Sequence, residues 1–369
     1  AGHDAPKIAG FLTRCLFSMF AEDVGLLPAG AFRELLEAAI ADPQNPPESF
    51  VVTLGELWQK MDSRGYSLAL RQKIPHFNGK LFKQPEVIAL TRAQIEILHR
   101  AACQNWKQVE PAIFGTLMER SLSAEERHAL GAEYTPRDYV ERLVMPTLID
   151  PLREEWDAVR NNAMKAWASG KHQHAPKLLR RFHQRLCELR ILDPACGSGN
   201  FLYIALEHLK RIEAEVLEQI ESMRVSKTLE TEHLTVDPHQ FLGIELNPRA
   251  AAIAELVLWI GYLQWHYKTN GNVLPASPIL RDFKNIECRD AVLQYSGTET
   301  VTDSEGNPVR IWDVRTMKTH PATGKAVPDE TATREQIRYL NPQAAHWPKA
   351  DVVVGNPPFI GAATMRRAL

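Results

Sequence analysis

The stretch that decides the fold of this 369-residue chain is Ile191-Leu192-Asp193-Pro194-Ala195-Cys196-Gly197-Ser198-Gly199-Asn200-Phe201. Two apolar residues lead into an acidic residue, a proline and small turn-forming residues, and a long amphipathic segment follows to about residue 222. This order predicts a β-strand, a tight glycine loop and an α-helix. Gly197 and Gly199 can adopt backbone conformations that are closed to other residues, and the first helical turn directs free N–H groups toward a ligand. The stretch is therefore a candidate ligand-binding loop.

A dinucleotide-binding loop is the nearest alternative, and three features argue against it. That fingerprint needs a third glycine, where this chain has Leu202, and an acidic residue about 20 positions further on. The next strand-end carboxylate here, Glu245, lies at more than twice that distance. The loop also carries Asp193, which would repel a pyrophosphate. A cationic or zwitterionic nucleoside fits better, and S-adenosylmethionine is one.

Three later segments continue the pattern of a strand followed by a loop. An apolar run at 241–245 ends in an acid, a second strand is expected to end within 286–291, and the run 350–354 leads into Asn356. The alternation of strands and helices predicts an α/β fold with a Rossmann-like, doubly wound parallel sheet. Ligands of such sheets bind at the carboxyl ends of the strands.

The acidic residues at these strand ends suit a nucleoside cofactor. Glu245 is expected to accept the ribose hydroxyls, although a carboxylate near the start of a helix also interacts favourably with the helix dipole. Asp290 is expected to accept from the adenine amine, with Ala291 against the ring. Asp193 is expected to order the loop and to meet the cofactor's amino group.

The segment Asn356-Pro357-Pro358-Phe359 is the candidate chemical centre. An adenine exocyclic amine is a poor nucleophile because its lone pair is delocalised into the ring. The Asn356 side-chain oxygen and the Pro357 carbonyl could each accept one amine hydrogen and aim the lone pair at a sulfonium methyl group. Phe359 would stack on a base extruded from the duplex. Alone, an Asn-Pro-Pro turn is equally an ordinary loop, but its place after a glycine loop and two strand-end acids favours catalysis.

Three short segments resemble motifs of the amino-methylating DNA methyltransferases. Residues 193–199 resemble their first motif, and Val354-Gly355-Asn356-Pro357-Pro358-Phe359 resembles their catalytic motif. Glu133-Tyr134-Thr135-Pro136 resembles the motif that precedes the first one in the gamma-ordered adenine-N6 group, although Thr135-Pro136 is also an ordinary helix cap followed by proline at the first helical position. Nearly the whole chain, including Phe11-Leu12-Thr13-Arg14-Cys15-Leu16-Phe17, resembles the MmeI-like (type IIL) restriction–modification enzymes.

The resemblance implies an incomplete class I S-adenosylmethionine methyltransferase fold and adenine-N6 methylation of double-stranded DNA in a restriction–modification or phage-defence protein. It implies S-adenosylmethionine as cofactor, and DNA-recognition elements and a nuclease domain elsewhere in a longer parent protein. Carried over residue by residue, the expected cofactor-binding set is Thr135, Pro136, Asp193, Ala195, Cys196, Gly197, Ser198, Gly199, Asn200, Phe201, Glu245, Leu246, Asp290 and Ala291.

The chain begins with Ala rather than Met and stops about ten residues after the loop that ends at Phe359, whereas family members have seven strands, so both chain ends look cut. We therefore expect the strand at 351–354 to have an unpaired edge or to pair with a segment outside this sequence. We also expect the chain alone to bind DNA weakly and to methylate no specific site.

Composition excludes several other classes. The chain has 44% hydrophobic and 24% charged residues with a net charge of −2, which is typical of a globular protein and not of a general polyanion binder. No apolar run of about 18 residues and no secretory signal is present, which favours a cytoplasmic protein without membrane contact.

The five cysteines of the chain include no C-x-x-C pair, and no His/Cys/carboxylate cluster has metal spacing, so we expect no metal site and metal-free methyl transfer. Cys196 is interpreted as a small residue that fits the tight loop.

Two domains are expected: a helical spacer over 1–120 and a methyltransferase domain over 121–369. Residues 151–190 are expected to form a helix with a basic stripe, either a solvated face or a phosphate contact. An irregular insertion is expected at about 295–345, with a hairpin at Gly306-Asn307.

The alternatives to a DNA methyltransferase are a glutamine-N5 or RNA methyltransferase, and a non-catalytic DNA-binding or assembly module that keeps the fold.

Overall fold

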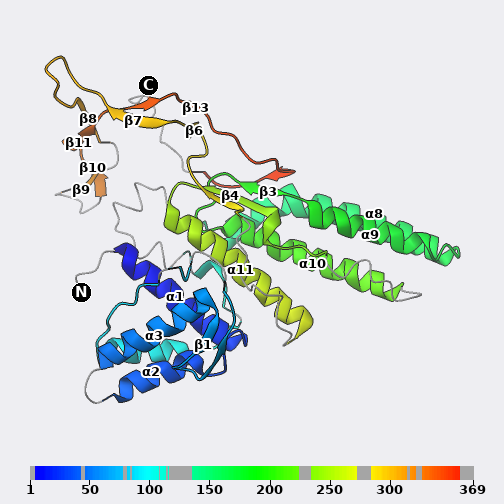
Figure 1. Ribbon diagram of the computed structural model, residues 1–369. Helices are drawn as coiled ribbons and strands as arrows, with labels where there is room; N and C mark the ends of the chain where they lie inside the picture. The colour runs from blue at the N-terminus through cyan, green and yellow to red at the C-terminus, as the bar shows by residue number, and fades with distance from the viewer. Residues whose placement is uncertain are drawn as a thin grey trace.

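A computed structural model describes residues 5–42, 46–77, 81–83, 85–107, 109–113, 115, 135–223, 234–271, 284–313, 316–320 and 326–357. The N-terminal part is helical, as expected, with α1 (Ala5–Asp23), α2 (Ala31–Ala41), α3 (Pro46–Ser63) and α4 (Arg92–Ala102) (Figure 1). A short antiparallel hairpin of β1 (Gly65–Ser67) and β2 (Gln72–Ile74) follows α3. The expected domain boundary near residue 120 lies outside the described residues.

Aromatic side chains form the core of the helical part. The ring of Phe17 lies edge-on to Phe77 at 5.7 Å and contacts Phe82 at 5.6 Å, measured between ring centroids. Trp58 is fully buried, and its indole nitrogen donates to the Ser18 hydroxyl at 3.0 Å. Because each of these rings is shared between segments distant in sequence, the helices form one packed unit.

A four-stranded parallel sheet forms the second part of the chain. Its strands are β3 (Ile191–Asp193), β4 (Phe241–Glu245), β5 (Ile286–Cys288) and β14 (Val352–Val353), in the order β14-β3-β4-β5. The glycine loop after β3 leads into α10 (Asn200–Ser222), and α11 (Pro248–Asn270) connects β4 to β5. The predicted strands, their parallel pairing and the helices between them are confirmed.

The two faces of the sheet are covered differently. Ile191 and Phe241 belong to the large core in which α10 and α11 pack on the sheet. On the opposite face Leu192, Leu242 and Ile244 form a small separate cluster with Ala291 and Ala350 against it. No described helix belongs to this smaller cluster, so a sheet wound on both faces stays a prediction.

The segment 151–190 contains two helices, where one was expected. They are α8 (Asp150–Ala168) and α9 (His174–Glu188), which pack side by side after α7 (Arg137–Val144) and a π-helical turn (Met145–Ile149) (Figure 1). Gly170, at φ +78°, lies in the corner between them, where a left-handed backbone favours glycine. The predicted basic stripe is exposed on α9 at Lys177, Arg181 and Arg185.

The insertion at 295–345 was expected to be irregular, and this prediction is wrong. It is an antiparallel ribbon that projects from the sheet (Figure 1). The paired strands are β6 (Leu293–Gln294) with β13 (Gln343–Ala344), β7 (Gly297–Thr300) with β12 (Ile337–Leu340), β8 (Arg310–Trp312) with β11 (Thr333–Glu335), and β9 (Met317–Thr319) with β10 (Ala326–Pro328). The expected hairpin is present, with a bridge between Thr302 and Pro308 and Gly306 at φ +85°.

Strand β14 lies at the end of the sheet. Among the described residues it pairs with β3 on one side and with no strand on the other, as the sequence predicted. Val353 is 52% exposed, so the run 351–354 is not covered on both faces by described residues. None of the helices described is both long and apolar enough to span a membrane.

Candidate cofactor and catalytic site

The glycine loop is fixed by backbone bonds to the neighbouring strand. The Cys196 N–H donates to the Ile244 carbonyl at 3.1 Å, and the Gly199 N–H donates to the Cys196 carbonyl at 2.8 Å. Gly199 has φ +83°, and a Cβ there would lie 3.0 Å from Ala254 of α11. A left-handed backbone and close helix packing therefore both require glycine at this position, as the sequence predicted for the loop.

Cys196 packs against the sheet and is not poised for reaction. Its side chain is buried, and burial raises the pKa of its thiol well above the usual value. A Cβ on Gly243 of β4 would approach the Cys196 sulfur to 2.7 Å, so the thiol occupies the space that the glycine leaves. This supports the interpretation of Cys196 as a small packing residue of the loop.

Glu245 joins the loop to the end of β4. One of its carboxylate oxygens accepts from the Gly197 N–H at 2.8 Å, and the other accepts from the Asn247 N–H at 2.7 Å. Asn247 in turn caps α11 through its side-chain oxygen, which accepts from the Arg249 N–H. Each carboxylate oxygen has a second lone pair, so these bonds orient Glu245 and leave acceptor capacity toward a ligand.

Asp193, at the end of β3, is buried with one oxygen unsatisfied. Its Oδ1 accepts from the Ala195 N–H at 3.0 Å, whereas Oδ2 is buried without a partner among the described residues. Burial, reinforced by the negative charge of Glu245, raises the pKa of the Asp193 carboxyl to about 7. A Cβ on Gly355 would lie 2.3 Å from Oδ1, so the backbone just before Asn356 passes directly over this carboxyl group. A buried, unpaired carboxyl is suited to a cationic ligand group.

Asp290 lies in the wall of a cavity beyond β5. Its Oδ1 accepts from the Val292 and Leu293 N–H groups at 2.7 and 3.1 Å, which fixes the turn into the ribbon. The cavity has a volume of about 630 Å³ and includes Leu246, one of the expected cofactor-binding residues. The rest of its wall consists of residues that the sequence interpretation missed, at the end of β5 and at the base of the ribbon: Glu287, Arg289, Leu293, Gln294, Tyr295, His346, Trp347 and Pro348. The indole nitrogen of Trp347 donates to the carbonyl of Ala291 at 2.6 Å.

Thr135 brings three distant segments of sequence together. The Asn200 side-chain nitrogen, at the start of α10, donates to the Thr135 carbonyl at 2.8 Å. The Asn356 side-chain nitrogen donates to the Thr135 hydroxyl at 3.4 Å. The alternative interpretation of Thr135, as the cap of the following helix, is wrong, because Pro136 is the N-cap of α7 and makes no side-chain cap bond. The hydroxyl is therefore available to Asn356.

Arg137 anchors the backbone next to Thr135. Its guanidinium contacts Glu207 of α10 at 2.7 Å, Glu141 of α7 at 2.8 Å and Glu110 at 3.1 Å. Burial opposes the charge of Arg137, but the carboxylates outweigh it and raise the Arg137 pKa above its usual value. This clamp ties α7 to α10 and to the segment that follows the helical part, and nothing in the sequence pattern had singled it out.

The remaining expected site residues lie in different environments. Ala195 and Ser198 are half-buried along the loop, and a Cβ on Gly115 would lie 2.2 Å from the Ser198 hydroxyl. Phe201 is buried in the large core, so its side chain anchors the end of the glycine loop to that core. Pro358, Phe359, Glu133 and Tyr134 lie outside the described residues.

Comparison with known proteins identifies the family. Residues 168–368 match the model of the MmeI DNA-methyltransferase domain, and residues 6–82 match that of the MmeI helicase spacer domain. The chain belongs to the MmeI-like DNA methyltransferases. The two matched ranges fall within the two domains expected from the sequence, without testing the boundary between them.

Individual relatives of this MmeI-like chain agree with that assignment. DNA methyltransferase A of Bacillus subtilis is 24% identical over 343 residues, which is 90% of this chain and 37% of the relative. A Methanocaldococcus jannaschii protein, named as a type II restriction enzyme and methyltransferase, is 27% identical over 71% of this chain and 25% of its own length. The solved structure of the type IIL restriction–modification enzyme MmeI in complex with DNA matches with TM-score 0.57 and 29% identity, over 79% of this chain and 36% of that one. The chain thus spans between a quarter and little more than a third of the length of these proteins.

Proposed function

We propose that this chain carries the cofactor site and the catalytic loop of a site-specific DNA methyltransferase. It would move a methyl group from S-adenosylmethionine to the N6 amine of an adenine flipped out of double-stranded DNA, as part of a cytoplasmic restriction–modification or phage-defence protein. The observation that supports this most is the pair of bonds through which Thr135 joins Asn200 and Asn356. They bring the glycine loop and the Asn-Pro-Pro loop to one place at the carboxyl ends of β3 and β14.

The residues at this edge fit S-adenosylmethionine. The unsatisfied oxygen of Asp193 would accept from the cofactor's ammonium group, and the spare lone pairs of Glu245 would accept from the ribose hydroxyls. The free oxygen of Asp290 and the cavity beside it would hold the adenine ring. When bound, the cofactor supplies an electrophilic methyl group on a sulfonium centre.

Asn356 and Pro357 would act on the target amine by position and electrostatics. Because the Asn356 amide nitrogen is engaged by Thr135, the oxygen of the same amide is the end available to accept an amine hydrogen. The Pro357 carbonyl would accept the other hydrogen. Held between two acceptors, the nitrogen presents its lone pair outward, and the acceptors stabilise the positive charge that develops on it. Phe359 would stack on the flipped base.

The proposal is tested by identifying the atom that receives the methyl group. The chain within its full-length parent is incubated with labelled S-adenosylmethionine and plasmid DNA, and nucleosides from the digested DNA are separated by mass spectrometry. Labelled N6-methyladenine is the expected product. Label on cytosine, or no transfer to the DNA, would contradict the proposal. The last outcome would favour the non-catalytic alternative.

A further inference from the structure

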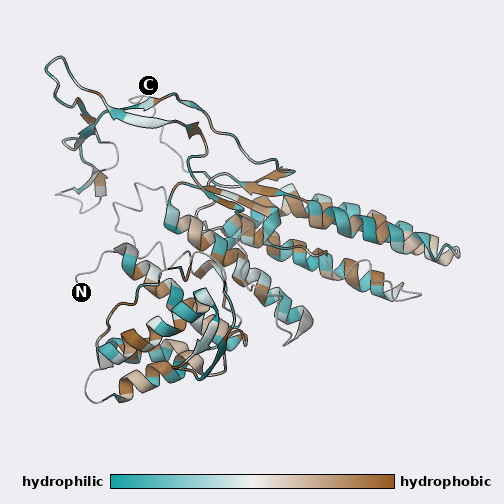
Figure 2. Cartoon of the chain, in the orientation of Figure 1, coloured by the Kyte–Doolittle hydropathy of each residue, from teal (hydrophilic) through white to brown (hydrophobic). Residues whose placement is uncertain are grey.

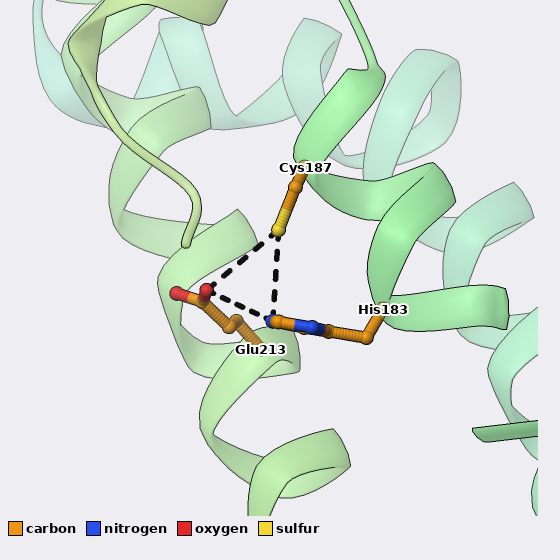
Figure 3. A group of neighbouring side chains, drawn as sticks. All are labelled: His183, Cys187 and Glu213. Carbon is orange, nitrogen blue, oxygen red and sulfur yellow. Dashed lines mark hydrogen bonds and ion pairs between the residues drawn. The ribbon is translucent and has the colours of Figure 1, made fainter. Parts of the chain in front are cut away.

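Three side chains outside the cofactor edge converge between α9 and α10. His183 and Cys187 are four residues apart and therefore share one face of α9, and both point at Glu213 of α10 (Figure 3). All three are buried, with 1%, 4% and 2% of their surfaces exposed. In the part of the chain that the structure describes, one potential ligand atom from each of the three lies within 4.8 Å of the others.

The distances among the three atoms match a face of a tetrahedral zinc site. His183 Nε2 lies 3.2 Å from Glu213 Oε1, and Cys187 Sγ lies 3.6 Å from His183 Nε2 and 3.9 Å from Glu213 Oε1. With zinc bonds of about 2.3 Å to sulfur and about 2.1 Å to nitrogen and oxygen, tetrahedral angles separate nitrogen from oxygen by about 3.4 Å and sulfur from either by about 3.6 Å. The three separations therefore differ from the ideal ones by about 0.3 Å or less.

Hydrogen bonding alone accounts for part of this cluster. Glu213 Oε2 pairs with the Lys210 ammonium at 2.6 Å, and Glu213 Oε1 accepts from the Val236 N–H at 2.8 Å. These contacts and the imidazole satisfy the carboxylate, and they are the kind of outer partner that orients a metal-binding carboxylate. The Cys187 thiol is explained less well, because its single proton can be donated to only one of its two neighbours, His183 Nε2 at 3.6 Å or Glu213 Oε1 at 3.9 Å. A metal ion at the centre would give the sulfur, the nitrogen and the oxygen one common partner.

We propose that His183, Cys187 and Glu213 bind a zinc ion that joins α9 to α10. Binding replaces the thiol proton of Cys187 by a sulfur–zinc bond and releases that proton to solvent. The imidazole binds through Nε2 and the carboxylate through Oε1, and a water molecule takes the fourth position. The site is separate from the cofactor edge, since α10 begins at the glycine loop while Glu213 lies more than three turns further along the helix.

The chain offers a matched control in its helical part. Cys103 also follows a histidine by four residues, with its sulfur 3.7 Å from His99 Nε2, and His99 Nε2 lies 3.0 Å from Glu37. In this second group Cys103 and Glu37 are exposed and His99 is partly buried, and the three are not among the described groups whose ligand atoms all lie close to one another. Changing Cys103 therefore tests whether any histidine–cysteine pair on a helix is sufficient to bind the ion.

The experiment measures zinc bound by the chelator-treated chain after equilibrium dialysis against zinc sulfate. We expect about one zinc per wild-type chain, the same amount in Cys103→Ser, and loss of at least tenfold in affinity in Cys187→Ser and His183→Gln. Wild-type chain that binds no zinc, or zinc lost in Cys103→Ser and kept in Cys187→Ser, would overturn the proposal. Circular dichroism verifies that each variant is folded.

A second measurement needs no variant and keeps the proposal testable if Cys187→Ser does not fold. Cobalt(II) replaces zinc in the wild-type chain, and the absorption spectrum is recorded. Sulfur ligation predicts a near-ultraviolet charge-transfer band, and tetrahedral geometry predicts intense visible bands. Weak bands of octahedral cobalt without a sulfur band would show that the ion is bound elsewhere, and the zinc site would be rejected. Neither measurement depends on methyl transfer.

Discussion

The parallel sheet and the antiparallel ribbon of this chain differ in how burial constrains their sequences. Strands β3 and β4 are almost fully buried, and their residues could be recognised as strands from apolar runs that end in an acid. All four residues of β12 in the ribbon are exposed, and the ribbon is predominantly hydrophilic or mixed in Figure 2. In the sheet, burial restricts which side chains fit, so the sequence shows an apolar pattern. In the ribbon, backbone hydrogen bonds between paired strands provide most of the stabilisation, so the side chains can vary.

If burial constrains the sheet edge, a substitution there should have a large effect, and the largest loss of cofactor affinity is expected at the buried Asp193 of β3. Asp193→Asn removes the only charge proposed to meet the cofactor's ammonium group. Loss of a buried charge partner costs about 3–5 kcal/mol, so affinity for S-adenosylmethionine should fall at least about 100-fold by calorimetry. Unchanged affinity would contradict the assignment.

The same variant should change how stability depends on pH. Because the pKa of Asp193 is raised to about 7 in the folded chain, its contribution to stability is present below about pH 4 and is lost as the pH rises through 7. Without cofactor, Asp193→Asn should therefore match the wild type near pH 4 and melt at a higher temperature at pH 8. A difference in melting temperature that does not grow with pH would contradict the burial of this charge.

A smaller effect is expected at Glu245. In Glu245→Ala the loop loses the acceptor of the Gly197 N–H, and the ribose loses its proposed partner. Charge-assisted hydrogen bonds of this kind contribute about 1.5–3 kcal/mol, so cofactor affinity should fall roughly 10- to 150-fold. Glu245→Gln, which keeps one carbonyl acceptor, should lose less. Equal affinity in wild type and Glu245→Ala would remove Glu245 from the site.

The smallest effects compare one glycine at the sheet with one in the ribbon. A Cβ on Gly355 would lie 2.3 Å from Asp193 Oδ1, whereas the nearest atom to a Cβ on Gly297 is the end of the Leu340 side chain at 3.7 Å. Gly355→Ala should lower the free energy of unfolding by about 1–3 kcal/mol, and Gly297→Ala should change it by less than about 0.5 kcal/mol. Denaturant unfolding measures both. Equal effects would show that the ribbon is packed as tightly as the sheet edge.

The sequence predicted those parts of the site that burial and loop chemistry constrain. Gly199, Asp193 and Glu245 lie where the strand–loop–helix pattern placed them. The pattern left two interpretations of Thr135 open, since a threonine before proline looks the same whether its hydroxyl caps a helix or belongs to a site, and the structure excludes only the cap. It missed Arg137 and the His183–Cys187–Glu213 cluster because each needs a carboxylate on α10, Glu207 or Glu213, that is distant in sequence. It missed the ribbon because exposed strands need no alternation of apolar residues.

The most direct test of the proposed mechanism is the single-turnover rate of Asn356→Ala in the full-length parent, measured with cofactor affinity on the same protein. Asn356 bonds to Thr135 and is expected to act on the target amine, not on the cofactor. The account predicts that methyl transfer falls by about 100- to 1,000-fold while affinity for S-adenosylmethionine stays within a few-fold of wild type. A rate within a few-fold of wild type would contradict the account.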